Sequence, residues 1–235
     1  MRHLICLALL ALAPAPTLAQ NFEEGEIVVT GTRRDADDYD ETVPAVGLKR
    51  VADFAVQQVT VVGDTRDQQK RRDEIFAMIR GAIDVAARRG DVELATGDMV
   101  VEPLTASNYR NLALTNDGRP DTDGTTFLVK TRLGGTDTKA ALDRIAAFIK
   151  AVPTVGRAEM RASGNLTLSI VGPDQYRGRI VDLVAADARA TAAKLGPDYA
   201  VEAAGLDRPV EWARASLTEV FLYVPYRYTV VPARR

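Results

Sequence analysis

Two hydrophobic periods alternate along residues 51–231, and this alternation limits the fold more than any other feature of the chain. Between residues 75 and 86, apolar side chains recur every three or four positions, which is typical of a helix that buries one face. Residues 51–63 and 127–133 have the β-branched and alternating pattern of strands. The order of the segments lacks strict βαβ regularity. The pattern therefore predicts an α+β fold, a mostly antiparallel sheet packed by two long helices and one shorter helix.

The expected elements follow from these periods and from the glycines between them. Helices are expected at residues 64–89, 139–150 and 175–195, with Gly90 and Gly196 as their stops. Asp64 or Thr65 is expected to cap the first helix, whose second face, including Arg71, is expected to be solvated. The 139–150 helix is expected to bury Leu142, Ile145, Ala146 and Ile149. Strands are expected at residues 51–63, 92–104, 127–133, 155–160, 166–171, 199–204, 210–213 and 220–231, with a turn at 162–165 joining the 155–160 and 166–171 strands.

The first nineteen residues have the pattern of a secretory signal peptide. A short polar start with Arg2 precedes the apolar run 4–12, and small residues at Thr17 and Ala19 fit a cleavage site after Ala19. The run is shorter than the roughly 20 residues that span a bilayer. The sequence thus predicts three regions: a signal peptide at 1–19, an acidic N-terminal arm with a short strand at 20–45, and an α+β domain at 46–232. Export to a Gram-negative periplasm is expected, with outer-membrane association as a further option.

The chain has one cysteine and one histidine, Cys6 and His3, and both lie in this leader. The mature chain would therefore lack a thiolate nucleophile, a histidine ligand and an imidazole base. Asp117, Asp121 and Asp123 lack the spacing of an EF-hand loop and are expected to form a solvated turn. We expect no catalytic, cofactor-binding or metal-binding residues and no cofactor. The formal net charge of −2 and the absence of a basic stripe argue against nucleic acid as a partner.

Three segments resemble the bacterial SIMPL-domain family, exported envelope proteins of poorly defined function. Ala52-Asp53-Phe54-Ala55-Val56 with the following strand and helix is similar to the part after that family's opening strand. The polar, tyrosine-containing loop and strand from Glu102 to Leu133 resemble its middle. The alanine-rich stretch 185–196 (AADARATAAKLG) resembles its helix ending in Leu-Gly. The resemblance covers Glu26 to Val231 and implies a SIMPL-like fold and a role in envelope maintenance or stress protection. A long spacer before Ala52 and the missing second glycine after Gly31 depart from the family pattern.

The short apolar cluster Ile27, Val28 and Val29 has two interpretations. It is expected to form an added strand of the domain's own sheet. The segment Glu26–Arg33 also resembles the TonB box of outer-membrane receptors, in which an extended segment pairs with a strand of the energy-transducing partner. In that interpretation, Ile27, Val28 and Val29 bind an envelope protein.

The final segment, 220–231, is expected to be one long strand with two apolar faces. Alternation places Phe221, Tyr223 and Arg227 on one face, which is either buried in the monomer or an oligomer contact. The sequence thus predicts a non-enzymatic periplasmic protein that acts by binding or self-assembly. An accessory role in TonB-linked transport is the first alternative, and a cofactor-free hydrolase using carboxylates is the second.

Overall fold

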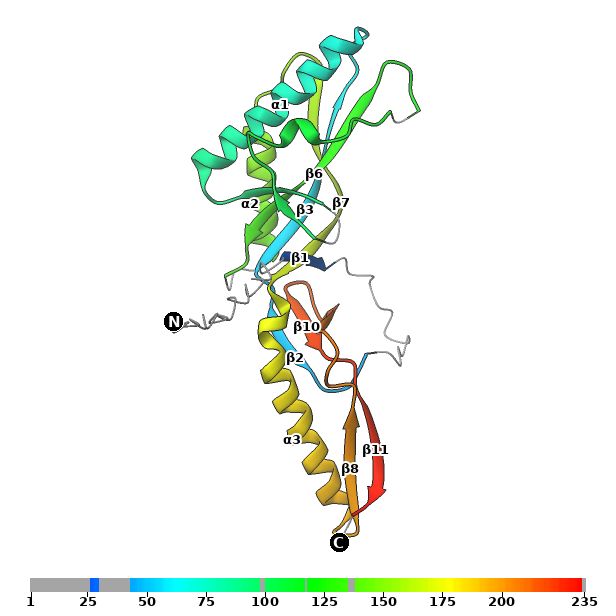
Figure 1. The fold of residues 1–235 in the computed structure, drawn as a ribbon. Coiled ribbons are helices and arrows are strands. Elements are labelled where there is room, and N and C mark those ends of the chain that lie inside the picture. Colours follow the sequence, from blue (N-terminus) through cyan, green and yellow to red (C-terminus); the bar gives the residue numbers. More distant parts are fainter. Residues whose placement is uncertain (1–25, 30–42, 98–99, 117, 135–137, 234–235) are drawn as a thin grey trace, which may run out of the picture.

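A six-stranded antiparallel sheet forms the upper half of the molecule as drawn in Figure 1. The computed structural model describes residues 26–29, 43–97, 100–116, 118–134 and 138–233, so the leader and most of the N-terminal arm lie outside the described residues. The strand order is β1-β7-β3-β6-β4-β5. The strands are β1 (Glu26–Val29), β3 (Phe54–Gly63), β4 (Glu93–Thr96), β5 (Glu102–Pro103), β6 (Asp123–Arg132) and β7 (Ala158–Val171).

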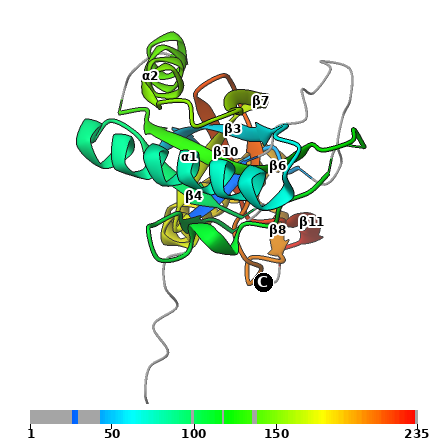
Figure 2. The same ribbon diagram turned by 90° about the horizontal axis from the view of Figure 1, so that it is seen from above.

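Two helices cover one face of this sheet. The helix α1 (Gln68–Arg89) runs across the strands, and α2 (Thr138–Ala151) lies beside it (Figure 2). Ile75, Ile79 and Phe148 are among the helical residues that pack on Val59 and Phe127 of the sheet in one hydrophobic cluster. The predicted register of α2 is partly wrong: Ala141, Ile145 and Phe148 are its buried residues, whereas Leu142 is exposed.

The start of α1 differs from the prediction, whereas its end agrees with it. Asp67 is the N-cap and accepts a hydrogen bond from the Lys70 amide, at 2.7 Å. The predicted caps serve other partners, because Asp64 binds Arg157 and the Thr65 hydroxyl donates to Glu74. At the other end, Gly90 has a φ of 69° and its N–H donates to the carbonyl of Ala86, which is the left-handed helix stop that glycine favours.

The two strands predicted at 155–160 and 166–171 are one continuous strand, β7. The predicted turn at 162–165 is instead an irregularity in its pairing with β3, opposite Gln57. The buried side chain of Gln57 donates to the carbonyls of Ser163, at 2.6 Å, and Gly164, at 3.3 Å. These side-chain bonds replace the ladder bonds that the irregularity removes, so the strand continues.

The lower half is built around α3 (Arg177–Leu195), which follows the short helix η2 (Pro173–Tyr176). A three-stranded sheet of order β2-β10-β9 packs near its start, and a two-stranded ribbon of β8 and β11 lies along its second half (Figure 1). The strands are β2 (Leu48–Val51), β8 (Tyr199–Ala204), β9 (Glu211–Arg214), β10 (Glu219–Tyr223) and β11 (Arg227–Pro232). A second hydrophobic cluster joins Ile180 and Val184 of α3 to Leu168 and Ile170 of β7 and to Leu222 of β10.

The single terminal strand predicted at 220–231 is wrong. It is interrupted at Val224-Pro225-Tyr226, and its halves, β10 and β11, belong to different sheets. Proline lacks the N–H that an uninterrupted central strand needs. The predicted fold class is confirmed: the described residues form an α+β structure of antiparallel sheets with two long helices and a shorter one.

Candidate functional site

The end of the lower half is an incompletely covered layer, here called the distal layer. It consists of residues 185–195 of α3 and of the strands β8 and β11. None of the described residues in 185–195, 199–204 and 227–232 is buried. A two-stranded ribbon with half a helix has little core of its own, and such units depend on further packing for stability.

The distal layer exposes apolar side chains. Tyr199 and Val230 are each 51% exposed, and Leu195 in the last turn of α3 is 43% exposed. Val230 pairs with Val201, and Tyr199 with Pro232. Since alternate residues of a strand share a face, Tyr199, Val201 and Val230 lie on the same face of the ribbon. Tyr228 lies on this face too and contacts α3 at the base of the ribbon, so the face offers an apolar contact surface only near the tip of the molecule.

Two tyrosines hold the base of the ribbon against the rest of the lower half. The Tyr228 hydroxyl donates to the carbonyl of Val184 in α3, at 2.7 Å, and the rings of Tyr226 and Tyr228 lie 4.8 Å apart. Burial raises the pKa of both hydroxyls above the ordinary tyrosine value, so both rings stay neutral near neutral pH. The ribbon is therefore anchored at its base, while its tip carries the exposed residues.

The residues predicted as an oligomer contact do not form one surface. Tyr223 is buried in β10, and the half-buried Phe221 ring stacks on it, with the ring centroids 5.7 Å apart. The Phe221 ring also lies so close to Gly47 that a Cβ there would clash with it. Arg227 is exposed in β11, in the other sheet. The structure therefore separates Arg227 from the aromatic pair, and their role in oligomer contacts stays a prediction.

The predicted partner-binding segment lies in β1, at one edge of the six-stranded sheet. Ile27 pairs with Ile170, Val28 with Ser169 and Val29 with Leu168. The Ser169 carbonyl accepts a hydrogen bond from the Asp53 amide, and the Val171 amide donates to the Asp53 carboxylate. The main-chain groups of Ser169 and Val171 therefore point toward β3. Because the direction alternates along a strand, the main-chain groups of Leu168 and Ile170 point toward β1. Consequently the amides of Ile27 and Val29 face β7, whereas the amide of Val28 points away from β7.

The face of the six-stranded sheet that α1 and α2 leave uncovered carries a cleft of about 740 Å³, lined by threonines and other polar residues together with apolar ones. A second hollow of about 410 Å³ adjoins it, and both are lined by Val62, Thr122 and Arg161. Cavities of a few hundred Å³ suit small ligands. Sequence reasoning missed the cleft, because its residues come from the four strands β3, β4, β6 and β7 and from the loop segment 112–115, and share no motif. The alternation in β3 that buries Val59 and Val61 was the available signal, since it turns Gln58 and Thr60 to the other face.

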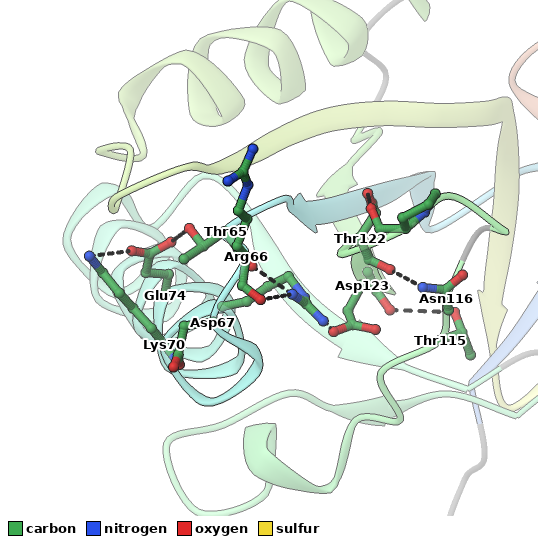
Figure 3. A network of polar contacts seen from close by, with 12 residues as sticks. Thr65, Arg66, Asp67, Lys70, Glu74, Thr115, Asn116, Thr122 and Asp123 are labelled. Carbon is green, nitrogen blue, oxygen red and sulfur yellow. Dashed lines mark hydrogen bonds and ion pairs between the residues drawn. The ribbon is translucent and has the colours of Figure 1, made fainter.

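A polar network beside this cleft holds the start of β6 in place (Figure 3). Arg71 Nε lies 2.5 Å from Asp123 Oδ2, with the Arg71 side chain only 6% exposed. Arg71 also donates to the carbonyl of Thr65, at 2.6 Å. On the other side of Asp123, Asn116 donates to the carbonyl of Thr122, at 2.6 Å. The prediction that Arg71 is solvated is wrong, because it spans the gap between α1 and the start of β6.

Glu74 is the other buried charge of the network. Its carboxylate accepts from the Thr65 hydroxyl, at 2.5 Å, and from the Arg157 amide, at 3.2 Å. The Thr65 bond, followed by the Arg157 bond, holds the pKa of this carboxyl below its usual value. Close by, Arg157 forms two 2.6 Å bonds with Asp64 and lowers the pKa of that carboxyl as well. These carboxylates stay ionised and serve as anchors between α1, β3 and β7.

The comparisons add no relative: no family model, curated protein or solved structure matches this chain. Membership of the SIMPL family therefore stays a prediction from the three segments. Across the described ranges, no three or more His, Cys, Asp or Glu side chains are grouped to hold a metal ion. Likewise, none of the helices in these ranges is long and apolar enough to cross a membrane.

Proposed function

We propose that the protein is an exported, non-catalytic protein of the Gram-negative envelope that self-associates through its distal layer. The observation that carries this proposal is the absence of any buried residue in 185–195, 199–204 and 227–232, combined with the exposure of Leu195, Tyr199 and Val230. Export rests on the signal-peptide pattern of residues 1–19. The non-catalytic assignment rests on the confinement of His3 and Cys6 to that leader.

A second copy of the chain is the occupant that suits this layer best. The distal layer also carries charges of both signs along its length, with Asp187, Arg189 and Lys194 on α3 and Glu202 and Arg227 on the ribbon. A surface with both signs can meet itself across a two-fold axis without repulsion of like charges. Edge-to-edge strand pairing is disfavoured. The Ala233 amide points toward β8, because it donates to the Asp198 carbonyl. The backbone nitrogen of the preceding Pro232 therefore points to the outer edge of β11, and proline has no N–H to donate there. The copies therefore meet through side chains.

Light scattering on residues 20–235 after size-exclusion chromatography tests this proposal. We expect the wild type to be oligomeric and Val230→Asp to be largely monomeric, because a carboxylate would be buried in the apolar contact. Leu217→Asp is the matched control: Leu217 lies in the turn between β9 and β10, outside the distal layer, and is 67% exposed. A monomeric wild type, or equal dissociation by both variants, would refute the proposal.

The edge position of β1 favours a second candidate function, docking to a TonB-like envelope protein. A partner strand adds to a sheet through main-chain bonds with an open edge, and the outward amide of Val28 offers one such donor. Val28→Pro removes this donor and leaves the pairing of β1 with β7 in place. Loss of pull-down of a TonB-like periplasmic domain by Val28→Pro would support docking. Absence of pull-down by the wild type would exclude it.

A further inference from the structure

The uncovered face of the six-stranded sheet has a polar centre made of aligned residues. Thr60 of β3 pairs with Thr126 of β6 and with Arg161 of β7, so the three side chains form one row across the sheet. Gln58 and Ser163 belong to the next row. Thr96, Asn165 and Thr167 also line the cleft. The cleft therefore presents hydroxyls, side-chain amides and one guanidinium.

The cleft is held open by its surroundings. In the row beyond Thr60, Val62 pairs with Gly124, which has no side chain to fill the space over the sheet. One wall is the segment 112–115, where the Thr115 amide donates to the carbonyl of Gly124 and the Gly124 amide to the carbonyl of Thr115. The neighbouring Arg71–Asp123 pair fixes the start of β6. Because these contacts exist without a ligand, binding requires little reorganisation of the wall.

The hydroxyl groups of the cleft remain able to accept hydrogen bonds. Thr60 donates its hydroxyl proton to Ser163 Oγ, at 2.8 Å, and Thr167 donates to the Val56 carbonyl, at 3.2 Å. Each oxygen keeps lone pairs for donors from outside. Val62 and Leu128 provide apolar contact between the polar groups. This combination suits a ligand with many hydroxyl groups and intervening C–H surface, which is the chemistry of a saccharide.

The guanidinium groups add a preference for negative charge. Arg161 forms no hydrogen bond or ion pair within the described part of the chain, and it lines both the cleft and the adjoining hollow. Arg119 and Arg157 line the same hollow, as does Asp64, which forms an ion pair with Arg157. Glu159 is the remaining carboxylate of the hollow and limits the excess positive charge to about one unit. A ligand with one anionic group would neutralise this excess of one positive charge.

We propose that this cleft binds a saccharide carrying one carboxylate, with Arg161 as the partner of the carboxylate. Arg donates two parallel hydrogen bonds to a carboxylate. The hydroxyl of Thr126 and the amide of Gln58 bind the sugar hydroxyls beside it. The site is independent of self-association, because it lies on the upper sheet and the distal layer lies at the opposite end of the molecule (Figure 1).

The test uses residues 20–235 and a matched pair of sugars, cellobiouronic acid and neutral cellobiose, with acetate as the anion alone. Binding is followed by NMR of the backbone amides. We expect cellobiouronic acid to shift the amides of Thr60, Thr126 and Arg161, and to bind at least about tenfold more tightly than cellobiose or acetate. Cellobiose lacks the charge-assisted pair with Arg161, and acetate lacks the hydrogen bonds of the sugar hydroxyls. Absence of shifts at the cleft, or equal affinity for cellobiouronic acid and acetate, would overturn the proposal.

Two variants assign the roles. Arg161→Gln should lower the affinity for cellobiouronic acid about tenfold and leave the affinity for cellobiose unchanged. Thr126→Val should weaken both sugars, since it removes a hydroxyl and keeps the β-branched shape. Arg80→Gln, on the exposed surface of α1, is the control and should bind as the wild type does. If Arg161→Gln and Arg80→Gln bind cellobiouronic acid equally, Arg161 is not the carboxylate partner and the proposal fails.

Discussion

Arg71 and Asp123 are opposite charges held where water has little access. Removing one partner of a buried pair leaves the other charge unpaired, which typically costs about 3–5 kcal/mol. We expect Asp123→Ala to lower the free energy of unfolding by about 3 kcal/mol, as measured by urea denaturation. The double variant Arg71→Leu/Asp123→Ala should lose less than the sum of the two single variants, because it leaves no unpaired charge.

The control for this pair is Arg80 and Asp84, which lie 3.3 Å apart on the exposed surface of α1 with both side chains 48% exposed. Asp84→Ala should cost only about 0.3–0.5 kcal/mol, as solvent-exposed pairs one helical turn apart do. Equal losses for Asp123→Ala and Asp84→Ala would contradict the structural role of the buried pair.

Glu74 gives the stability of the fold a pH dependence. Its folded-state pKa lies below the usual value of 4.5, so the folded state binds fewer protons than the unfolded chain in the acidic range. The stabilisation is complete above the unfolded pKa and is lost as the pH falls through the folded one. We expect the unfolding free energy of the wild type to fall more steeply between about pH 5 and pH 3 than that of Glu74→Gln. Parallel curves would show that Glu74 is not a stabilising anchor.

The partners and the burial of single polar residues are poorly predicted from the sequence. In the run Lys70-Arg71-Arg72-Asp73, nothing local distinguishes Arg71 from its neighbours. It is buried because Asp123, 52 residues later, lies against α1. Asp64 and Thr65 are suitable caps by residue type. However, Arg157, 93 residues later, binds Asp64, and Glu74, nine residues later, accepts the hydrogen bond of Thr65. Polar partners outside the local pattern therefore decide the outcome at each of these residues.

Elements with a long, regular period were predictable, and elements shaped by tertiary contacts were not. The helix α1 and most of the strand β3 follow from the spacing of their apolar residues, although the predicted strand begins at Val51, which belongs to β2. The helix α3 follows from its alanine-rich sequence and from the stop at Gly196. The continuity of β7 depends on the side chain of Gln57, which belongs to another strand. The break after β10 could have been predicted from Pro225, which the alternating apolar residues around it obscured. The cleft and the distal layer are properties of several elements together, so no single segment revealed them.

The pairing of β1 with β7 predicts different effects for two neighbouring proline substitutions. Ile27→Pro removes an amide that faces β7, whereas Val28→Pro removes one that faces outward, and both restrict φ alike. We expect Ile27→Pro to speed hydrogen exchange at the amides of Leu168 and Ile170 several-fold, in line with a lost bond of about 1 kcal/mol. Val28→Pro should leave that exchange nearly unchanged. Equal exchange in both variants and the wild type would indicate that β1 does not pair with β7.

The whole molecule has a packed end and an incomplete one. Its upper half buries two helices against a sheet, and its middle joins β7, α3 and β10 in a second cluster. The distal layer contains the part of α3 beyond Val184, and none of its residues is buried. Regions with few buried contacts open readily and exchange their amides quickly. Self-association through this layer would supply the missing contacts and slow that exchange.

Hydrogen–deuterium exchange of residues 20–235, measured at low and at high protein concentration, tests this central claim most directly. The account predicts that peptides covering β8 and β11 exchange more slowly as the concentration rises, because mass action increases the fraction of associated protein. Peptides covering β3, which lies in the core of the upper sheet, should exchange at the same rate throughout. Exchange in β8 and β11 that is fast and independent of concentration would contradict self-association through the distal layer.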